Sequence, residues 1–274
     1  MLKHRLIFGT FLIIAALGLF WAEDHFQQDG RIIAIALLGI VPLAMIELAG
    51  IFRAKSITVS PALMTLAALA TAAAVFLGRS ANLVGLMLTL TFIAAMAWHC
   101  RHKTTQGALG ATAATVFGAV YLGVFSAFYL LITREHTCWV ALAVVLITKM
   151  GDTGAFFTGH AIGKHKLIPW LSPGKTWEGL AGAVVWCTGF AVGFAYLGRL
   201  TNEPGNHFSL AAAAGLGAVL AIVGHAGDLS VSVMKRDAGV KDSGRSMPGF
   251  GGMLDVMDSP LLVGPIAYWL LHVM

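Results

Sequence analysis

Long runs of uncharged, mostly apolar residues recur along this sequence, and they constrain its fold more than any other feature. The clearest runs cover 6–22, 56–78, 104–133 and 179–198. A helix that spans a lipid bilayer needs about 20 such residues. The runs are continuous and do not alternate between apolar and polar residues, as the strands of a membrane β-barrel would. The sequence therefore predicts an all-α, polytopic transmembrane protein.

The composition supports the same fold class, because 58% of the residues are hydrophobic and only 11% are charged. Soluble domains carry about 25% charged residues, so a soluble core of this length could not bury the apolar excess. The cysteines, Cys100, Cys138 and Cys187, lie far apart, which indicates neither a zinc site nor a disulfide framework. No basic run with interleaved aromatic residues accompanies the net charge of +5, so no nucleic-acid partner is expected.

Nine spans can be placed, with edges uncertain by several residues. They cover roughly 5–22, 32–52, 58–78, 82–99, 107–132, 137–158, 178–198, 208–228 and 251–273. Basic residues concentrate in cytoplasmic loops of membrane proteins. A cytoplasmic N-terminus puts thirteen Lys and Arg residues on the cytoplasmic side and four on the other. We therefore expect this orientation. The first run could also be a signal peptide, but no small-residue cleavage site precedes Glu23, so we interpret it as a spanning helix.

The sequence changes character near residue 148. Before this position polar residues lie mainly in short loops, whereas after it charged residues, Gly and Pro interrupt the apolar pattern. We therefore predict one integrated membrane domain with two regions. Residues 1–148 form a transmembrane scaffold, and residues 149–274 form a transmembrane catalytic region with cytoplasmic loops.

The first polar element of the catalytic region is the pair Lys149 and Asp152 at the end of the sixth span. The two residues are three positions apart, so they share one face of a helix. A charge at the centre of a spanning helix costs about 2.5–3.5 kcal/mol on insertion scales. The pair is therefore either an internal ion pair or part of the lining of a ligand cavity.

The second polar element is the loop 163–179, which ends at the start of a helix. Ser172, Lys175 and Thr176 stand just before that helix. The free N–H groups and the positive dipole end of a helix N-terminus suit a phosphate group. The loop lacks the Gly-x4-Gly-Lys spacing of a Walker A motif. An ordinary basic cytoplasmic loop with a helix N-cap is the alternative interpretation.

The third polar element, residues 227–259, has the densest charge in the chain, with five aspartates and four basic residues. A solvated loop does not explain Asp228, Asp255 and Asp258, because each borders an apolar span. Asp255 and Asp258 also face the same way on a helix. Paired carboxylates beside a basic, glycine-rich loop suit Mg²⁺ and a polyphosphate, since Mg²⁺ takes few protein oxygens and Lys and Arg neutralise phosphate charge.

In this third element the chain resembles the phosphatidate cytidylyltransferase (CDP-diacylglycerol synthase) family. The family pattern runs Ser-x-x-Lys-Arg, four residues, Lys-Asp, then Pro-Gly-His-Gly-Gly and Asp-Arg-x-Asp. The matching positions here are Ser232, Lys235, Arg236, Lys241, Asp242, Pro248, Gly249, Gly251, Gly252, Asp255 and Asp258. Upstream, 172–179 resembles the family's Ser-Pro-Lys-Lys-Thr-x-Glu-Gly element, and 152–159 resembles its Asp-x-x-Ala-Tyr-x-x-Gly element.

The chain departs from this pattern at three positions. Phe250 stands in place of the usual His, which removes an acid/base or phosphate-binding group. Val256 replaces the usual Arg and removes a charge beside the carboxylates, and Val231 replaces an acidic residue.

The resemblance implies a reaction in which phosphatidate attacks the α-phosphorus of CTP, giving CDP-diacylglycerol and pyrophosphate. The catalytic residues it implies are Asp228, Lys235, Lys241 and Asp255. The implied substrate-binding residues are Asp152, Ser172, Lys175, Thr176, Ser232, Arg236, Asp242, Gly249, Gly251 and Gly252. The implied ligands of Mg²⁺ are Asp228, Asp255 and Asp258, and whether a monovalent cation joins the Mg²⁺ is left open.

The resemblance also implies a location and partners. The enzyme would lie in a bacterial-type inner membrane with its active site facing the cytoplasm, where CTP is found. A homodimer is implied as well, although nothing in the residues themselves requires one. Three other functions stay open at this point. They are a transporter with an intramembrane ion pathway, a CTP-dependent enzyme that uses another lipid, and an inactive relative that lacks the His and the Arg.

Overall fold

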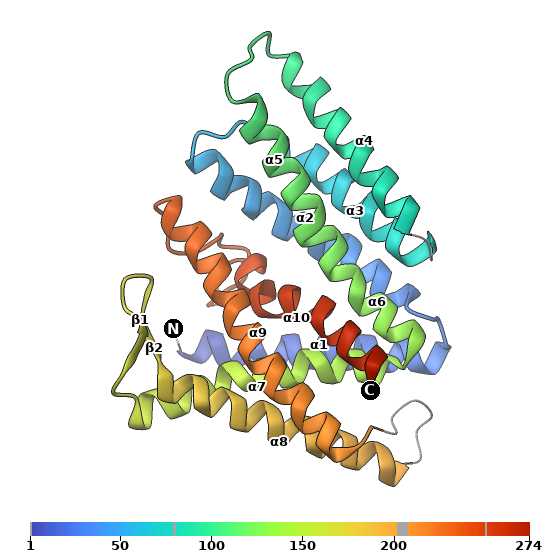
Figure 1. Cartoon of the computed structure of the whole chain (residues 1–274), viewed down its shortest axis with the longest axis vertical. Coiled ribbons are helices and arrows are strands. Elements are labelled where there is room, and N and C mark those ends of the chain that lie inside the picture. Colours follow the sequence, from blue (N-terminus) through green and yellow to red (C-terminus); the bar gives the residue numbers. More distant parts are fainter. Residues whose placement is uncertain (1, 79–80, 202–207, 250) are drawn as a thin grey trace. The chain divides into compact units, whose positions relative to one another are not determined.

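The computed structural model describes residues 2–78, 81–201, 208–249 and 251–274, and helices dominate this part of the chain (Figure 1). In chain order the elements are α1 (Leu2–Phe26), α2 (Arg31–Ala54), α3 (Pro61–Gly78), α4 (Ala81–Cys100), α5 (Ala108–Gly118), the π-helical turn η1 (Ala119–Val124), α6 (Phe125–Glu135), α7 (Cys138–Ile162), β1 (Lys166–Ile168), β2 (Ser172–Thr176), α8 (Trp177–Thr201), α9 (Leu210–Asp237) and α10 (Met253–Val273). The two strands form a small antiparallel hairpin that the sequence analysis did not predict.

Helical segments occupy all nine of the predicted spans. Within the described residues, eight are long and apolar enough to cross a membrane, and α5, η1 and α6 together form one of them, Ala108–Glu135. The segment Pro61–Leu77 is apolar but shorter. The predicted polytopic, all-α membrane fold is thereby confirmed, while the cytoplasmic position of the N-terminus stays a prediction.

Packing groups the described chain into two compact units. The first unit runs up to Leu131 and includes Met234–Met257, and the second consists of Ile132–Val233 and Asp258–Met274. Helices α9 and α10 therefore each contribute residues to both units. This grouping reflects packing rather than chemistry, so the predicted division at residue 148 into scaffold and catalytic region stays a prediction.

In the first unit, the π-helical turn η1 packs closely on α3. Gly123 lies so near Ala68 that an added Cβ would come within 2.8 Å of the Ala68 Cα. The Thr71 hydroxyl lies 3.1 Å from the carbonyl oxygen of Ala119, at the start of the turn. A π turn disturbs the regular hydrogen bonding of a helix, and a backbone carbonyl in a membrane needs a partner within the protein. The Thr71 hydroxyl offers one from the neighbouring helix, and it shares its single hydrogen with the carbonyl oxygens of Ala67 and Ala68, each 2.9 Å away.

In the second unit, small residues allow α7, α8 and α9 to pack closely, and α7 and α8 run side by side (Figure 1). Gly154 faces the ring of Trp186, and Gly182 faces Thr158. The Cys187 thiol donates to the carbonyl oxygen of Ile147 over 3.1 Å. Small residues at such contacts are typical of membrane helices, because they let the backbones approach each other.

Gly217 provides the first testable prediction, because it lies where α9 meets α8. A Cβ at this position would be 2.6 Å from the Cys187 carbonyl oxygen and 2.7 Å from the Thr188 Cα, both backbone atoms. Gly217→Ala should therefore lower the thermal unfolding temperature in detergent, with a cost of about 1–3 kcal/mol. The control is Gly215→Ala on the same helix, where a Cβ would meet nothing within 4 Å. Equal unfolding temperatures for the two variants would contradict this packing.

Candidate active site

Five charged side chains of the second unit, Lys149, Asp152, Lys175, Asp228 and Asp258, form what we call the lysine–aspartate cluster. These residues come from four elements, α7, β2, α9 and α10. Lys175 Nζ lies 2.8 Å from Asp228 Oδ2. Lys149 Nζ lies 3.2 Å from Asp152 Oδ2 and 3.9 Å from Asp258 Oδ1. The cluster therefore gathers residues from all three polar elements of the sequence.

Lys149 and Asp152 pair along α7, as their spacing of three residues predicts. Their side chains are 33% and 37% exposed, so this ion pair is accessible and not sealed in the core. Asp258 is much more buried, with its side chain 9% exposed. It accepts hydrogen bonds from the Ser259 N–H over 2.6 Å and from the Ser259 hydroxyl over 3.3 Å. Lys149 thus links an accessible carboxylate to a buried one.

Gly227 brings α9 against α10 at this point. A Cβ on Gly227 would be 2.6 Å from the carbonyl oxygen of Asp258, so only glycine fits without displacing a helix. The Asp228 and Asp258 carboxylates are close enough to interact electrostatically. Two carboxylates brought together repel each other unless cations lie nearby, and Lys149 and Lys175 provide that positive charge.

Lys175 reaches the cluster from the hairpin between α7 and α8. The strands pair Lys166 with Thr176 and Ile168 with Ser172, which places Ser172 at the start of β2. Lys175 is largely buried, with its side chain 14% exposed, and its Nζ also lies 3.5 Å from the His225 carbonyl oxygen. The hairpin therefore holds this lysine against α9.

Thr176 and Glu178 organise the start of α8. The buried Thr176 hydroxyl accepts a hydrogen bond from the Gly179 N–H over 3.0 Å, as a helix N-cap does. Gly159, Gly163 and Gly179 pack around this hydroxyl. Glu178 binds His165, with 2.6 Å between Oε1 and Nδ1, and also accepts from the His165 N–H. His165 was missed by the sequence analysis, where it stood as one residue of a basic loop.

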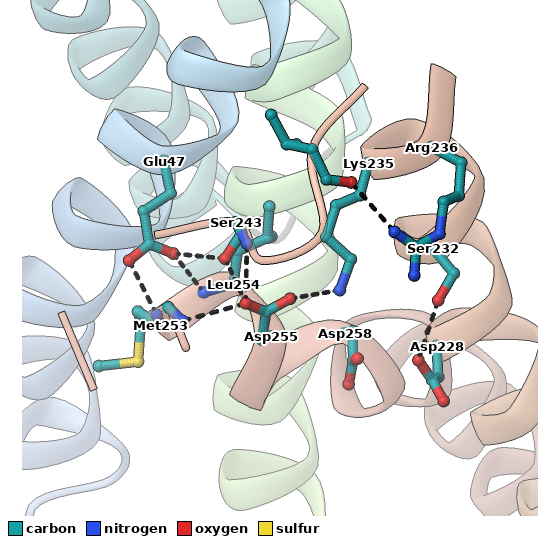
Figure 2. A network of polar contacts seen from close by, with 12 residues as sticks. Glu47, Asp228, Ser232, Lys235, Arg236, Ser243, Met253, Leu254, Asp255 and Asp258 are labelled. Carbon is teal, nitrogen blue, oxygen red and sulfur yellow. Dashed lines mark hydrogen bonds and ion pairs between the residues drawn. The ribbon is translucent and has the colours of Figure 1, made fainter. Parts of the chain in front are cut away.

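Ser232 lies one helical turn beyond Asp228 on α9. Its hydroxyl is 3.5 Å from Asp228 Oδ1, which is a long contact (Figure 2). Asp228 is 34% exposed, so its carboxylate has Lys175 on one oxygen and still reaches solvent. Asp228 is therefore much more accessible than Asp258, whose side chain is 9% exposed.

The first unit contains a second polar group, which we call the loop-anchoring cluster: Glu47, Lys235, Ser243, Ser246 and Asp255. Figure 2 labels all of these residues except Ser246. Lys235 Nζ lies 2.6 Å from Asp255 Oδ1, and both side chains are nearly buried. The other Asp255 oxygen accepts from the Ser243 N–H over 2.9 Å, and it also lies 2.9 Å from the Ser243 hydroxyl, whose one hydrogen it shares with Glu47. These contacts hold the loop between α9 and α10 at the start of α10.

The sequence analysis missed three residues of this cluster, Ser243, Ser246 and Glu47, and Glu47 is the charged one. It belongs to α2, within the predicted scaffold, and is 8% exposed. It is the single charged residue between Arg31 and Arg53 in that span. This was the available signal, because a lone carboxylate at membrane depth is expensive unless it is bound.

The glycines of the loop lie against these carboxylates. Gly251 has a φ of +96°, and a Cβ there would be 2.7 Å from Asp255 Oδ2. A Cβ on Gly252 would collide with Glu47 and the Ser243 hydroxyl. Gly249 also has a positive φ, of +85°, which side chains rarely adopt. That these glycines let a triphosphate approach stays a prediction.

The remaining predicted residues lie on or near the same loop. Arg236 Nη1 is 3.4 Å from the Val240 carbonyl oxygen, and Lys241 and Asp242 are exposed. Val231 is buried in α9, and Val256 lies in the first turn of α10. Phe250, which stands where the family has His, lies outside the described residues.

The donors of the lysine–aspartate cluster fit a magnesium ion in chemistry and number. Mg²⁺ is commonly held by one or two carboxylates, with phosphate and water oxygens completing its shell. Asp228 and Asp258 supply two such carboxylates. Within the described ranges no group of three or more His, Cys, Asp or Glu side chains is placed to bind a metal. Both oxygens of Asp255 accept hydrogen bonds within the first unit, and its predicted role as a third ligand stays a prediction.

Comparison with known proteins identifies a family that matches nearly the whole chain. A family described as the cytidylyltransferase family matches residues 3–274. A phosphatidate cytidylyltransferase of Haemophilus influenzae is 36% identical over 124 residues, which cover 45% of this chain and 42% of that protein. One of Bacillus subtilis is 37% identical over 156 residues, covering 56% of this chain and 55% of the relative. One of Thermotoga maritima is 36% identical over 159 residues, covering 57% of each. The matched segments span about half the length of these relatives.

Proposed function

This chain belongs to the cytidylyltransferase family, and from that premise we propose that it transfers CMP from CTP to phosphatidate. The products are CDP-diacylglycerol and pyrophosphate. The observation that carries the proposal is the ion pair of 2.8 Å between Lys175 and Asp228, at the centre of the lysine–aspartate cluster. It joins two of the elements by which the sequence resembles the family. The names of three relatives, each a phosphatidate cytidylyltransferase, support the same lipid acceptor.

The chemistry of the reaction explains why such a cluster is needed. A phosphate oxygen of phosphatidate attacks the α-phosphorus of CTP, an O–P bond forms, and the bond to the β-phosphate oxygen breaks to release pyrophosphate. The attacking oxygen is already anionic and needs no strong base. The difficulty lies in bringing two polyanions together, so positioning and charge neutralisation dominate the catalysis.

Lys175 and Lys149 are the groups of the cluster that suit this task. Each is paired with an aspartate, which orients its ammonium group. A phosphate that enters the cluster exchanges a carboxylate partner for a phosphate oxygen, so the lysines lose little interaction energy. Asp228 and Asp258 would hold a magnesium ion. When bound, this ion neutralises charge on the phosphate oxygens of CTP.

The substrates also suggest where the enzyme acts. Phosphatidate lies in the bilayer and CTP is a cytoplasmic nucleotide, so we propose a bacterial inner membrane location with the site open to the cytoplasm. The predicted orientation places Lys175 on that side. A homodimer and a monovalent cation beside Mg²⁺ stay predictions.

The proposal is tested by assaying purified protein in detergent micelles that contain phosphatidate and radiolabelled CTP. We expect CDP-diacylglycerol in the presence of Mg²⁺ and a loss of at least about 100-fold after chelation with EDTA, restored by added Mg²⁺. Polyprenyl phosphate and archaeal-type ether lipid phosphates serve as competing acceptors. Product from one of these alone would replace phosphatidate as the substrate. No product from folded protein with any acceptor would overturn the proposed activity.

A further inference from the structure

We propose that Glu47 is a positioning residue for the transfer reaction. Through the N-terminus of α10, it determines where the Lys235–Asp255 ion pair is held. The role in catalysis rests on the function proposed above, whereas the anchoring of the loop rests on the structure of the first unit alone. Glu47 lies in α2, about 200 residues before the loop that it binds.

The Glu47 carboxylate accepts four hydrogen bonds, and all of them come from the loop and the start of α10. Figure 2 shows Glu47 beside three of these donors, Ser243, Met253 and Leu254. The Ser243 and Ser246 hydroxyls donate over 2.9 and 2.5 Å. The backbone N–H groups of Met253 and Leu254 donate over 3.0 and 2.9 Å. None of these four donors is a lysine or an arginine. Neutral hydroxyl and N–H groups therefore stabilise the buried Glu47 carboxylate.

The backbone donors show what Glu47 does for α10. Met253 and Leu254 are the first two residues of this helix, whose N–H groups have no partner inside the helix. Asp255, the third residue, accepts from the Gly252 N–H over 3.0 Å, as in a capping box. Two carboxylates therefore cap one helix, and one of them comes from α2. Negative charge at this end also interacts favourably with the helix dipole.

The same contacts connect Glu47 to the ion pair. The Ser243 hydroxyl lies 2.9 Å from Glu47 Oε2 and 2.9 Å from Asp255 Oδ2. The other oxygen of Asp255 pairs with Lys235. Gly244 and Gly252 pack directly against the Glu47 side chain, where an added Cβ would collide with it. The loop therefore cannot shift without breaking this packing. A displaced Glu47 would therefore displace Asp255 and Lys235, which the family resemblance predicts as catalytic.

The test compares Glu47→Gln with a matched control, Glu23→Gln. Glu23 is also a buried glutamate in a spanning helix, and it accepts backbone N–H groups at the start of another helix, from Gly30 over 2.7 Å and Ile33 over 3.0 Å. Glutamine keeps the volume of each side chain but replaces one acceptor oxygen with an NH₂ donor. Both variants should lose thermal stability to a similar extent, so unfolding temperature alone does not separate them.

Two readouts separate positioning from a structural role. The first is kcat and KM for CTP: Glu47→Gln should lower kcat at least tenfold, and Glu23→Gln less than twofold. The second is limited trypsin digestion, because Lys241 and Arg245 are exposed on the anchored loop. Cleavage there should be at least tenfold faster in Glu47→Gln than in wild type or Glu23→Gln.

The outcomes distinguish this proposal from the proposed function. Unchanged cleavage in Glu47→Gln would overturn the anchoring of the loop, whether or not the protein has activity. Faster cleavage with unchanged kcat would overturn the role in catalysis. An inactive wild-type protein whose loop is released in Glu47→Gln would refute the proposed reaction and leave the anchoring intact. Glu47→Asp serves as a second variant if Glu47→Gln does not fold, since it keeps the charge and shortens the reach.

Discussion

Replacing Asp228 with asparagine should reduce the rate of CDP-diacylglycerol formation by about 100-fold or more while the protein remains folded. The change removes one negative charge and leaves Lys175, whose side chain is 14% exposed, without its carboxylate partner at 2.8 Å. It also removes the more accessible of the two proposed magnesium ligands, so the Mg²⁺ concentration for half-maximal rate should rise. The measurement is the initial rate at saturating CTP over a Mg²⁺ titration, beside the thermal unfolding temperature.

Asp237→Asn is the matched control for this prediction. Asp237 lies at the end of the same helix and pairs with Lys55 over 3.0 Å, but its side chain is 64% exposed. An exposed ion pair contributes little to stability, and we place Asp237 outside the lysine–aspartate cluster. Its variant should retain at least about half of the wild-type rate. Equal rates for Asp228→Asn and wild type would contradict the role of Asp228 as a magnesium ligand and partner of Lys175.

Replacing Lys175 with methionine should have the second large effect, a fall in kcat/KM for CTP of about 100-fold. Methionine keeps most of the side-chain volume and removes the charge that neutralises a phosphate. It also leaves Asp228 beside Asp258 with one cation fewer, which weakens the cluster. Lys175→Arg should recover only part of the activity, because the guanidinium is larger than the ammonium that the hairpin holds.

Lys166→Met provides the control on the same hairpin. Lys166 is exposed on β1, opposite Thr176, and contributes no contact to the lysine–aspartate cluster that the structure describes. Its variant should change kcat/KM by less than about twofold. Comparable losses in both lysine variants would indicate that the hairpin contributes general positive charge, and would refute a specific contact of Lys175 with the substrates.

The sequence was informative wherever the physical signal is local. A run of about 20 apolar residues specifies a spanning helix whatever surrounds it, and all nine predicted spans contain helices. The spacing of three residues between Lys149 and Asp152 places them on one helix face, and they pair at 3.2 Å. The aspartates and Lys149 were recognisable because charge in or beside an apolar span needs an explanation, whereas Lys175 was recognisable by its position just before a helix.

Contacts between distant segments were decided by the tertiary structure alone. Nothing in the loop 163–179 predicts a hairpin, since Pro173 and Gly174 are poor strand formers and the strands are short. The pairing of Lys175 with Asp228, 53 residues later in the chain, depends on how α9 packs beside that hairpin. The sequence analysis placed Glu47 in the transmembrane scaffold, although its position in a span was itself a signal.

The sequence by itself determined the fold class, the spans and the residue types from which a phosphate-binding site is built. The tertiary structure decided which carboxylate pairs with which lysine, and which carboxylate anchors a loop. The physical reason is the range of the interactions. Apolar runs and helix periodicity can be read along the chain. The Lys235–Asp255 ion pair and the four hydrogen bonds to Glu47 instead require groups from separate segments to meet within about 3 Å in space.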